Sequence, residues 1–213
     1  HNLSYQQAWH LNKPVAGVYV AAPGYVFRSA GIPRQSVITE VDGAPTKNLN
    51  DFEAALAKLA DGQNASVRYF TLYNPQSSIL AIMRMDRRWF PVTRCARNDQ
   101  LGEWPCHELA AGPPALLPKP ATTEFVAEKD KRLSRIARSL VLVNFDMPYT
   151  ISGVGDRNYY GTGVIVDTER GYVVVDRNTV PEAMGDVRIT FAGSVEVRAK
   201  VVFVHPLHNL TIL

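Results

Sequence analysis

Apolar and polar positions alternate along most of the chain, and this alternation predicts two strand-rich blocks. In the first block, the apolar runs at 17–22 and 36–43 are each followed by turn residues, which is typical of buried strands. The runs at 66–73 and 78–85 flank the turn-forming segment 74–77 and predict a hairpin. With one helix before these strands and one between them, we expect a small, partly open sheet with a helix across its gap.

Capping signals place the two helices of the first block. Ser4 and Gln7 have the spacing of a capping box and predict a short helix that begins there. Asn50 is expected to cap the second helix, with Glu53 at the third helical position reaching back to it. The Pro-Gly pair at 23–24 predicts a turn after the first strand.

A proline-rich stretch separates the two blocks. Residues 111–123 hold four prolines in thirteen positions and are expected to run extended, as a semi-rigid spacer. The run 124–140 predicts a helix capped by Thr122 or Thr123, with acidic residues early and basic residues late, as the helix dipole favours. We interpret the basic end as a solvated helix end rather than as a phosphate site.

The second block consists almost wholly of strand patterns. Short turns that contain Gly or Asp separate the patterns, which is typical of an antiparallel barrel or sandwich. The predicted strands are 139–145, 161–167, 171–176, 186–192, 195–204 and 209–213. The expected fold class is mainly β with short helices.

The composition excludes several classes of protein. Hydrophobic residues make up 46% and charged residues 20% of the 213 positions, so the chain is neither disordered nor collagen-like. No apolar run approaches the roughly 18 residues of a membrane span. The small excess of 23 basic over 20 acidic residues is weak support for a nucleic-acid partner. We therefore expect no membrane partner, no nucleic-acid partner and no cofactor, and the chain termini suggest a fragment of a longer protein.

Two cysteines, Cys95 and Cys106, lie eleven positions apart. A disulfide between them would close a short loop and contribute roughly 2–3 kcal/mol in an oxidising compartment. Two unrelated thiols fit the sequence equally well, so the compartment stays open. Adding His107 to the pair does not complete the four ligands of a structural zinc site, and we expect no metal.

The segment 17–56 carries the turn residues and periods of a known family. Its Ala-Gly-Ile at 30–32, Val-Ile at 37–38 and Asp-Gly at 42–43 match, whereas Gln35-Ser36 replaces the usual Gly-Asp. On these motifs, residues 1–92 resemble a PDZ domain of the HtrA protease type. The resemblance implies an α+β domain that binds the hydrophobic C-terminal tails of peptides or proteins by strand addition.

In this family the tail pairs with an open sheet edge beside the helix, and a preceding loop captures its carboxylate. That loop would fall just before the start of the chain. The resemblance therefore suggests peptide-binding residues on the first strand and on the exposed edge of the helix: His1, Asn2, Leu3, Asp51, Ala55 and Lys58. The apolar helix positions Phe52, Leu56 and Leu59 are interpreted as core instead.

The block 139–213 resembles the N-terminal half of a trypsin-like protease barrel, again of the HtrA type. The runs 161–167 and 171–176 match the Gly-rich strand and the strand that leads to the catalytic His, and 205–213 matches the segment that carries the catalytic Asp. Position by position, the His falls on Asn178 and the Asp falls on Asn209.

These two replacements remove the chemistry of the triad. A serine protease needs an imidazole that accepts the serine proton and a carboxylate that stabilises the charged imidazole. Asn178 has no titratable group near neutral pH, and Asn209 could orient a ring but not offset its charge. Ser152 lacks the pattern of a nucleophile elbow. We expect His205 and His208 to share one face of a strand with no carboxylate beside them, and we expect no catalytic residue.

Three phrases, 1–12, 85–106 and 163–181, resemble most closely the large fungal-type HtrA relatives, which are nuclear, pro-apoptotic serine proteases with duplicated protease-PDZ units, and their bacterial counterparts. The resemblance implies a serine endopeptidase of protein quality control in which an active unit precedes the PDZ domain and a degenerate unit follows it. The implied partners are that active unit and further copies of the chain. The implied compartment is the periplasm for a bacterium or the nucleus for a fungus.

The resulting domain prediction is a PDZ domain at 1–92, a linker at 93–138 with the proline-rich spacer and a helix, and a degenerate half-barrel at 139–213. The alternative function is a non-proteolytic, chaperone-like or scaffold protein. A basic nucleic-acid binder is the least favoured interpretation, and it depends on the arginine-rich stretch 84–97.

Overall fold

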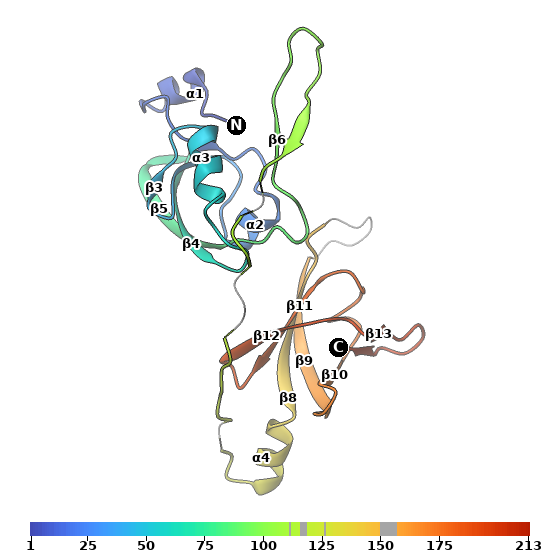
Figure 1. Ribbon diagram of the computed structural model, residues 1–213. Coiled ribbons are helices and arrows are strands. Elements are labelled where there is room, and N and C mark those ends of the chain that lie inside the picture. Colours follow the sequence, from blue (N-terminus) through green and yellow to red (C-terminus); the bar gives the residue numbers. More distant parts are fainter. Residues whose placement is uncertain (111, 116–118, 126, 150–156) are drawn as a thin grey trace. The chain divides into compact units, whose positions relative to one another are not determined.

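The computed structural model describes residues 1–110, 112–115, 119–125, 127–149 and 157–213 (Figure 1). The chain divides into two compact units, 1–118 and 119–213, and each is described by itself. The division falls inside the predicted linker. Strands predominate and the helices are few and short, so the expected fold class is confirmed. Among the described residues, no helix is both long enough and apolar enough to cross a membrane.

The first unit is an antiparallel sheet with helices packed on it. The sheet has the order β1-β2-β4-β5, with β3 paired to β2, and a separate two-stranded pair is formed by β6 and β7. The helices are α1 (Tyr5–His10), α2 (Gly24–Ser29) and α3 (Leu49–Leu56). The strands are β1 (Val18–Tyr19), β2 (Ser36–Val41), β3 (Ala44–Pro45), β4 (Asn64–Thr71), β5 (Asn74–Arg84), β6 (Thr93–Cys95) and β7 (Cys106–Glu108).

One helix start is confirmed and the other lies elsewhere. The Ser4 hydroxyl accepts the backbone N–H of Gln7 at 3.2 Å, and the capping box is complete. The cap of α3 is Asn48, not Asn50. The Asn48 backbone is extended and its side chain accepts the N–H of Asp51 at 3.0 Å, whereas Asn50 already lies within the helix.

The predicted hairpin exists, but its turn is shifted. Thr71 pairs with Asn74, so Leu72 and Tyr73 form a two-residue turn and the segment 74–77 belongs to β5. A proline at position 75 is tolerated because β5 is the last strand of the sheet and one of its edges is unpaired.

The predicted turn at 23–24 instead begins α2. Three of its neighbouring apolar side chains, Val26, Phe27 and Ala30, pack against the main core of the unit. Tertiary packing therefore stabilises a helix where the local Pro-Gly signal indicates only a turn.

The core of the first unit lies between the sheet and α3. Its members come from β2, β4 and β5 on one side and from the helix and its C-terminal extension on the other, and include Ile38, Val41, Leu59, Val67 and Met83. A smaller cluster on the opposite face of the sheet joins Leu3 and Ala8 to Val37 and Phe70.

The second unit is a strongly curved antiparallel sheet of seven strands in the order β12-β11-β8-β9-β10-β14-β13. Its elements are α4 (Lys131–Ala137), β8 (Leu140–Asp146), β9 (Asn158–Asp167), β10 (Tyr172–Val175), β11 (Asp186–Phe191), β12 (Val195–Ala199), β13 (Phe203–Val204) and β14 (Thr211–Ile212).

The first and last strands of this order, β12 and β13, are two halves of one bent segment, because only residues 200–202 separate them. The predicted strand 195–204 is therefore interrupted. Residues of β10, β11 and β12, together with Leu213 after β14, line one cavity of about 390 Å³, which shows that the sheet curls round on itself. The curled sheet forms a barrel that closes through this bend.

The helix predicted over 124–140 is much shorter, since α4 spans only Lys131–Ala137. Asp130, rather than Thr122 or Thr123, caps it, and its carboxylate accepts the N–H of Arg132 at 2.7 Å. The Thr123 hydroxyl is instead hydrogen-bonded to the hydroxyl of Ser194 at 2.5 Å.

Alternate side chains of the barrel strands fill its interior, among them Val141, Val143 and Phe145 of β8. Two glycines of β9 make room for them. A Cβ atom at Gly163 would lie 2.7 Å from Val173 Cγ1 and 2.8 Å from Val143 Cγ2, and one at Gly161 would overlap the Thr179 hydroxyl. The Gly-Thr-Gly sequence of β9 is thus required by packing.

We expect Gly163→Ala to lower the free energy of unfolding by about 1–3 kcal/mol, because the added methyl group overpacks the barrel interior. Urea unfolding monitored by circular dichroism measures the change. Thr162→Ser, at an exposed neighbouring position, is the control and should stay within about 0.5 kcal/mol of the wild type. Equal unfolding midpoints for Gly163→Ala and the wild type would contradict this account of β9.

Candidate functional site

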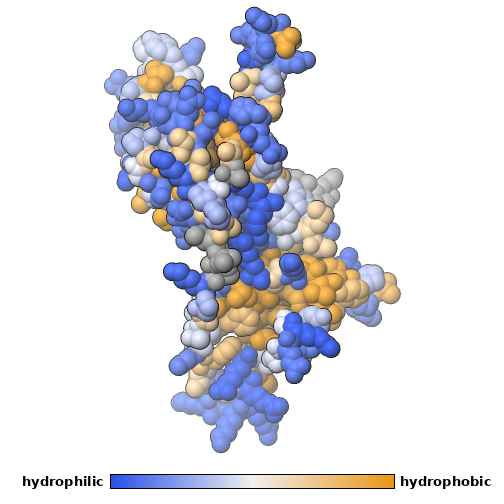
Figure 2. Space-filling view, viewed as in Figure 1, coloured by the Kyte–Doolittle hydropathy of each residue, from blue (hydrophilic) through white to orange (hydrophobic). Residues whose placement is uncertain are grey.

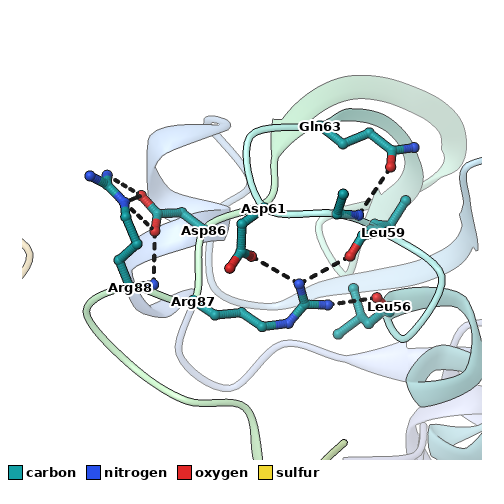
Figure 3. Close-up of polar contacts among 8 residues, drawn as sticks. Leu56, Leu59, Asp61, Gln63, Asp86, Arg87 and Arg88 are labelled. Atoms are coloured by element: carbon teal, nitrogen blue, oxygen red, sulfur yellow. Dashed lines mark hydrogen bonds and ion pairs between the residues drawn. The ribbon is translucent and has the colours of Figure 1, made fainter. Parts of the chain in front are cut away.

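The C-terminal end of α3 is held by one arginine (Figure 3). The Arg87 guanidinium donates to the carbonyls of Leu59 at 3.0 Å and Leu56 at 2.7 Å, and to the Asp61 carboxylate at 2.9 Å. Only 13% of the Arg87 side chain is exposed. The last carbonyls of a helix have no partner within the helix. Arg87 binds the carbonyl of Leu56, the last residue of α3, and that of Leu59 in the segment that follows, and so fixes the end of α3 against the chain after it.

The N-terminal residues lie between β1 and the start of α3. Asn2 forms an antiparallel bridge with Val18, and its side-chain oxygen accepts the N–H of Leu49 at 2.7 Å. The His1 ring packs on the Tyr19 ring with centroids 4.7 Å apart.

The six predicted peptide-binding residues differ in exposure. Leu3 is 3% exposed and Ala55 is 5% exposed, and both side chains belong to apolar clusters of the core. Asp51 lies in the first turn of α3, where its carboxylate accepts the N–H of Lys47 at 3.0 Å. His1, Asn2 and Lys58 are exposed. Peptide binding by these residues stays a prediction.

The three apolar helix positions belong to the core, as expected. Leu56 and Leu59 are buried, and Phe52 is half-buried and packs against them.

In the second unit, strand pairing brings together Asn178 and Asn209, the two positions that the sequence analysis predicts to correspond to the triad. β10 and β14 are antiparallel, with Val175 opposite Thr211, so the loop after β10 meets the loop before β14. Asn178 lies in the first loop and Asn209 in the second, and both line a pocket of about 750 Å³, here called the triad-position pocket. Its remaining lining residues are Tyr159, Arg177, Pro181, Glu182, Leu207 and His208.

Polar contacts hold the two loops of this pocket together. The Arg177 guanidinium donates to the carbonyls of His205 at 3.3 Å and Pro206 at 3.1 Å. The buried Thr211 hydroxyl donates to the Val180 carbonyl at 2.9 Å. These contacts fix the positions of the two loops that line the triad-position pocket.

A carboxylate, that of Asp176, lies near Asn178, but its oxygens accept hydrogen bonds from the turn that carries Asn178. Asp176 accepts the backbone N–H of Thr179 at 3.0 Å and its hydroxyl at 2.6 Å, which caps the turn that carries Asn178. Beside the pocket, the Tyr149 hydroxyl donates to the Met184 carbonyl, and burial and the charge of Glu182 raise the pKa of Tyr149.

The expectation that His205 and His208 share a strand face is wrong, because residues 205–210 form a turn rather than a strand. The Nδ1 atom of His205 accepts the backbone N–H groups of Leu207 at 3.2 Å and His208 at 2.9 Å, and this bends the chain. The two rings lie 4.5 Å apart, and the hydrogen bonds and ion pairs of the described residues include none from a carboxylate to either ring. Ser152 lies outside the described residues.

The sequence pattern alone does not identify Arg87, Arg94 or Arg177 as positioning residues. Their acceptors are carbonyls, carboxylates and a carboxamide that lie between 26 and 44 positions away in the sequence. The spacing of neighbouring residues does not predict contacts over such separations. Cys95 and Cys106, left open by the sequence, form a disulfide across β6 and β7. No group of three His, Cys, Asp or Glu side chains in the described part of the chain could hold a metal ion.

Comparison with known proteins adds two findings. The family model of the PDZ-like domain matches residues 1–62. The chain is 36% identical over 217 aligned positions to the pro-apoptotic serine proteases nma111 of Aspergillus oryzae and Neosartorya fischeri, and to NMA111 of Coccidioides immitis. Each alignment covers 100% of this chain and 21% of the relative, so the chain spans about a fifth of the length of these proteins. No solved structure matches.

We expect Arg87→Met to lower the free energy of unfolding of the first unit by about 2–3 kcal/mol, because the Leu56 and Leu59 carbonyls lose their charged donor. Denaturant unfolding measures the loss. Arg97→Met is the matched control, since Arg97 is exposed and pairs only with Asp99 nearby, and it should change stability by no more than about 0.5 kcal/mol. Equal effects of the two substitutions would exclude the proposed role of Arg87.

Proposed function

The chain is a homologue, along its whole length, of the HtrA-type pro-apoptotic serine proteases, and from this premise we propose that it is a regulatory part of such a protease. In this proposal a peptide-binding PDZ-like unit is followed by a protease-like barrel that has no catalytic activity. The longer protein acts as a serine endopeptidase in protein quality control. Its active unit is the partner of the segment described here.

The observation that supports peptide binding is the place of Asn2. Its bridge to Val18 and its bond to the N–H of Leu49 align the N-terminal strand beside the start of α3. An extended peptide that adds to this strand would therefore run along α3 and past the exposed Lys58. The lysine ammonium suits an acidic side chain or a terminal carboxylate of the peptide.

The absence of catalysis is supported by the triad-position pocket. Proton transfer in acyl chemistry needs a base near the reacting group, held by a second residue. The two residues that occupy these positions are carboxamides, and the nearby Asp176 is bonded to the turn that it caps. A pocket of this shape can still accept a chain segment as a binding surface. The barrel therefore serves as a scaffold for the active unit.

A second candidate is a chaperone-like binder of apolar segments, and one feature of the barrel favours it. Five apolar residues lie directly opposite one another across five neighbouring strands: Leu140, Val164, Val174, Ile212 and Phe203. Leu140, Val164 and Phe203 are 39%, 42% and 45% exposed. Figure 2 shows hydrophobic surface gathered over the strands of this unit. A complete Ser-His-Asp set elsewhere in the longer protein would favour the protease, and its absence would favour the binder.

Peptide binding is tested with fluorescein-labelled peptides that end in apolar residues, each made with a free and an amidated C-terminus. We expect the chain extended upstream to bind the free form at least tenfold more tightly than the amidated form, because a backbone loop captures the carboxylate. Lys58→Glu should weaken binding, and Lys119→Glu, outside the PDZ-like unit, should not. Fluorescence anisotropy gives the affinities, and failure of both the extended and the shorter chain to bind would refute peptide recognition.

The purified chain should not hydrolyse casein above the rate of a buffer blank, because the triad-position pocket offers no paired base. Release of fluorescein from labelled casein measures the rate. A serine-reactive fluorophosphonate probe provides the control for a contaminating protease. Labelling of the chain itself by the probe, or hydrolysis that Asn178→Ala abolishes, would overturn the inactive assignment.

A further inference from the structure

A two-stranded arm extends from the sheet of the first unit (Figure 1). The arm comprises residues 93–108, with β6 and β7 as its two strands. Cys95 and Cys106 lie directly opposite each other in this pair and are joined by the disulfide. Both cysteines are exposed to solvent. An exposed disulfide is open to attack by an external thiolate, in contrast to a staple buried in a core.

Backbone pairing and the disulfide hold the two strands of the arm together. The pairing of β6 with β7 continues outward, where the Ala96 N–H donates to the Pro105 carbonyl at 3.2 Å and the Asn98 N–H to the Glu103 carbonyl at 2.9 Å. A pair of strands with no further sheet or core is marginally stable in water, and the two large apolar side chains of the outer loop, Leu101 and Trp104, are 68% and 61% exposed and form no core. The disulfide is the covalent link that keeps this marginal pair closed.

The base of the arm is bonded to α3. The guanidinium of Arg94, the residue before Cys95, donates to the Glu53 carboxylate at 2.8 Å and to the Asn50 side-chain oxygen at 2.7 Å. Both acceptors lie on α3. A cavity of about 350 Å³ adjoins this contact, and its lining residues come from α3 and from both sides of the arm's base: Asn50, Glu53, Ala54, Leu56, Ala57, Arg87, Val92, Leu109 and Ala110.

We propose that the Cys95–Cys106 disulfide is a thiol–disulfide exchange site, and that its reduction by a dithiol releases the arm from α3. One thiolate of the dithiol attacks a cysteine sulfur, a mixed disulfide forms, and the other cysteine leaves as a thiolate that takes up a proton. The second thiol of the reductant then displaces the first cysteine. Two electrons pass to the protein, which ends with two thiols, and the reductant ends as a disulfide.

The consequence for α3 follows from the position of Arg94. Once the strands of the arm separate, β6 no longer holds the guanidinium in front of Glu53 and Asn50. The outer side of α3 then loses both hydrogen bonds and the cover of Val92 and Leu109. A change in peptide affinity would be a further effect that rests on the proposed function, whereas the release of α3 does not depend on it.

Hydrogen–deuterium exchange of the full chain tests the proposal. We compare the oxidised protein, the protein treated with dithiothreitol under native conditions, and the Cys95→Ser/Cys106→Ser double variant. Thiol titration should find two thiols per chain after reduction. In the dithiothreitol-treated protein and in the double variant, the backbone amides of the arm and of α3 should exchange at least fivefold faster than in the oxidised protein. The amides of β8 and β11 in the second unit should exchange at an unchanged rate.

Two further variants separate the disulfide from the contact with α3. Arg94→Gln keeps the disulfide but loses the charged bonds, so α3 should exchange faster while the arm stays protected. Arg97→Gln, whose side chain pairs with Asp99 within the arm, should leave α3 unchanged.

The proposal is overturned if native dithiothreitol yields no thiols, since the disulfide is then an inert staple. It is equally overturned if two thiols appear and α3 exchanges as in the oxidised protein. Loss of peptide binding in every form, with faster exchange of α3 on reduction, would refute the proposed function and leave the exchange site standing.

Discussion

The antiparallel pairing of β10 with β14 is the contact on which the second unit depends. Val173 and Leu213 exchange backbone hydrogen bonds of 3.1 and 2.9 Å beside the register pair Val174 and Ile212. This pairing joins the last strands of the chain to the rest of the sheet and so completes the barrel. It also brings together the loops that carry Asn178 and Asn209. The triad-position pocket is thus a consequence of strand pairing in this unit and requires no catalytic group for its formation.

In the first unit, α3 is the element on which separate features converge. Asn48 caps its first turn and Arg87 its last, so the backbone at both ends is satisfied by side chains from outside the helix. Asn2 reaches its N-terminal end and Arg94 its outer side. The predicted peptide groove and the disulfide arm therefore contact the same eight-residue helix.

Local signals predicted from the sequence were most reliable where the backbone itself decides the structure. The capping box at Ser4, the succession of strands along the chain and the position of Asn178 just after a strand follow from turn residues and periods, whereas Asn209 was predicted on a strand and lies before β14. Tertiary contacts decided the rest. Two asparagines, Asn48 and Asn50, carry the same capping signal, and only the path of the chain into α3 distinguishes them. The hydrogen bond between Arg94 and Glu53 joins residues 41 positions apart, and the sequence around either residue does not predict it.

The two glycines of β9 have a consequence for how such barrels are recognised in genomes. Gly161 and Gly163 are needed because Thr179, Val143 and Val173 occupy the space that a side chain would fill. These neighbours are parts of the barrel wall, and none of them takes part in hydrolysis. A search pattern built on the Gly-X-Gly strand therefore detects the architecture of the barrel and carries no information on whether the protein that contains it hydrolyses peptides.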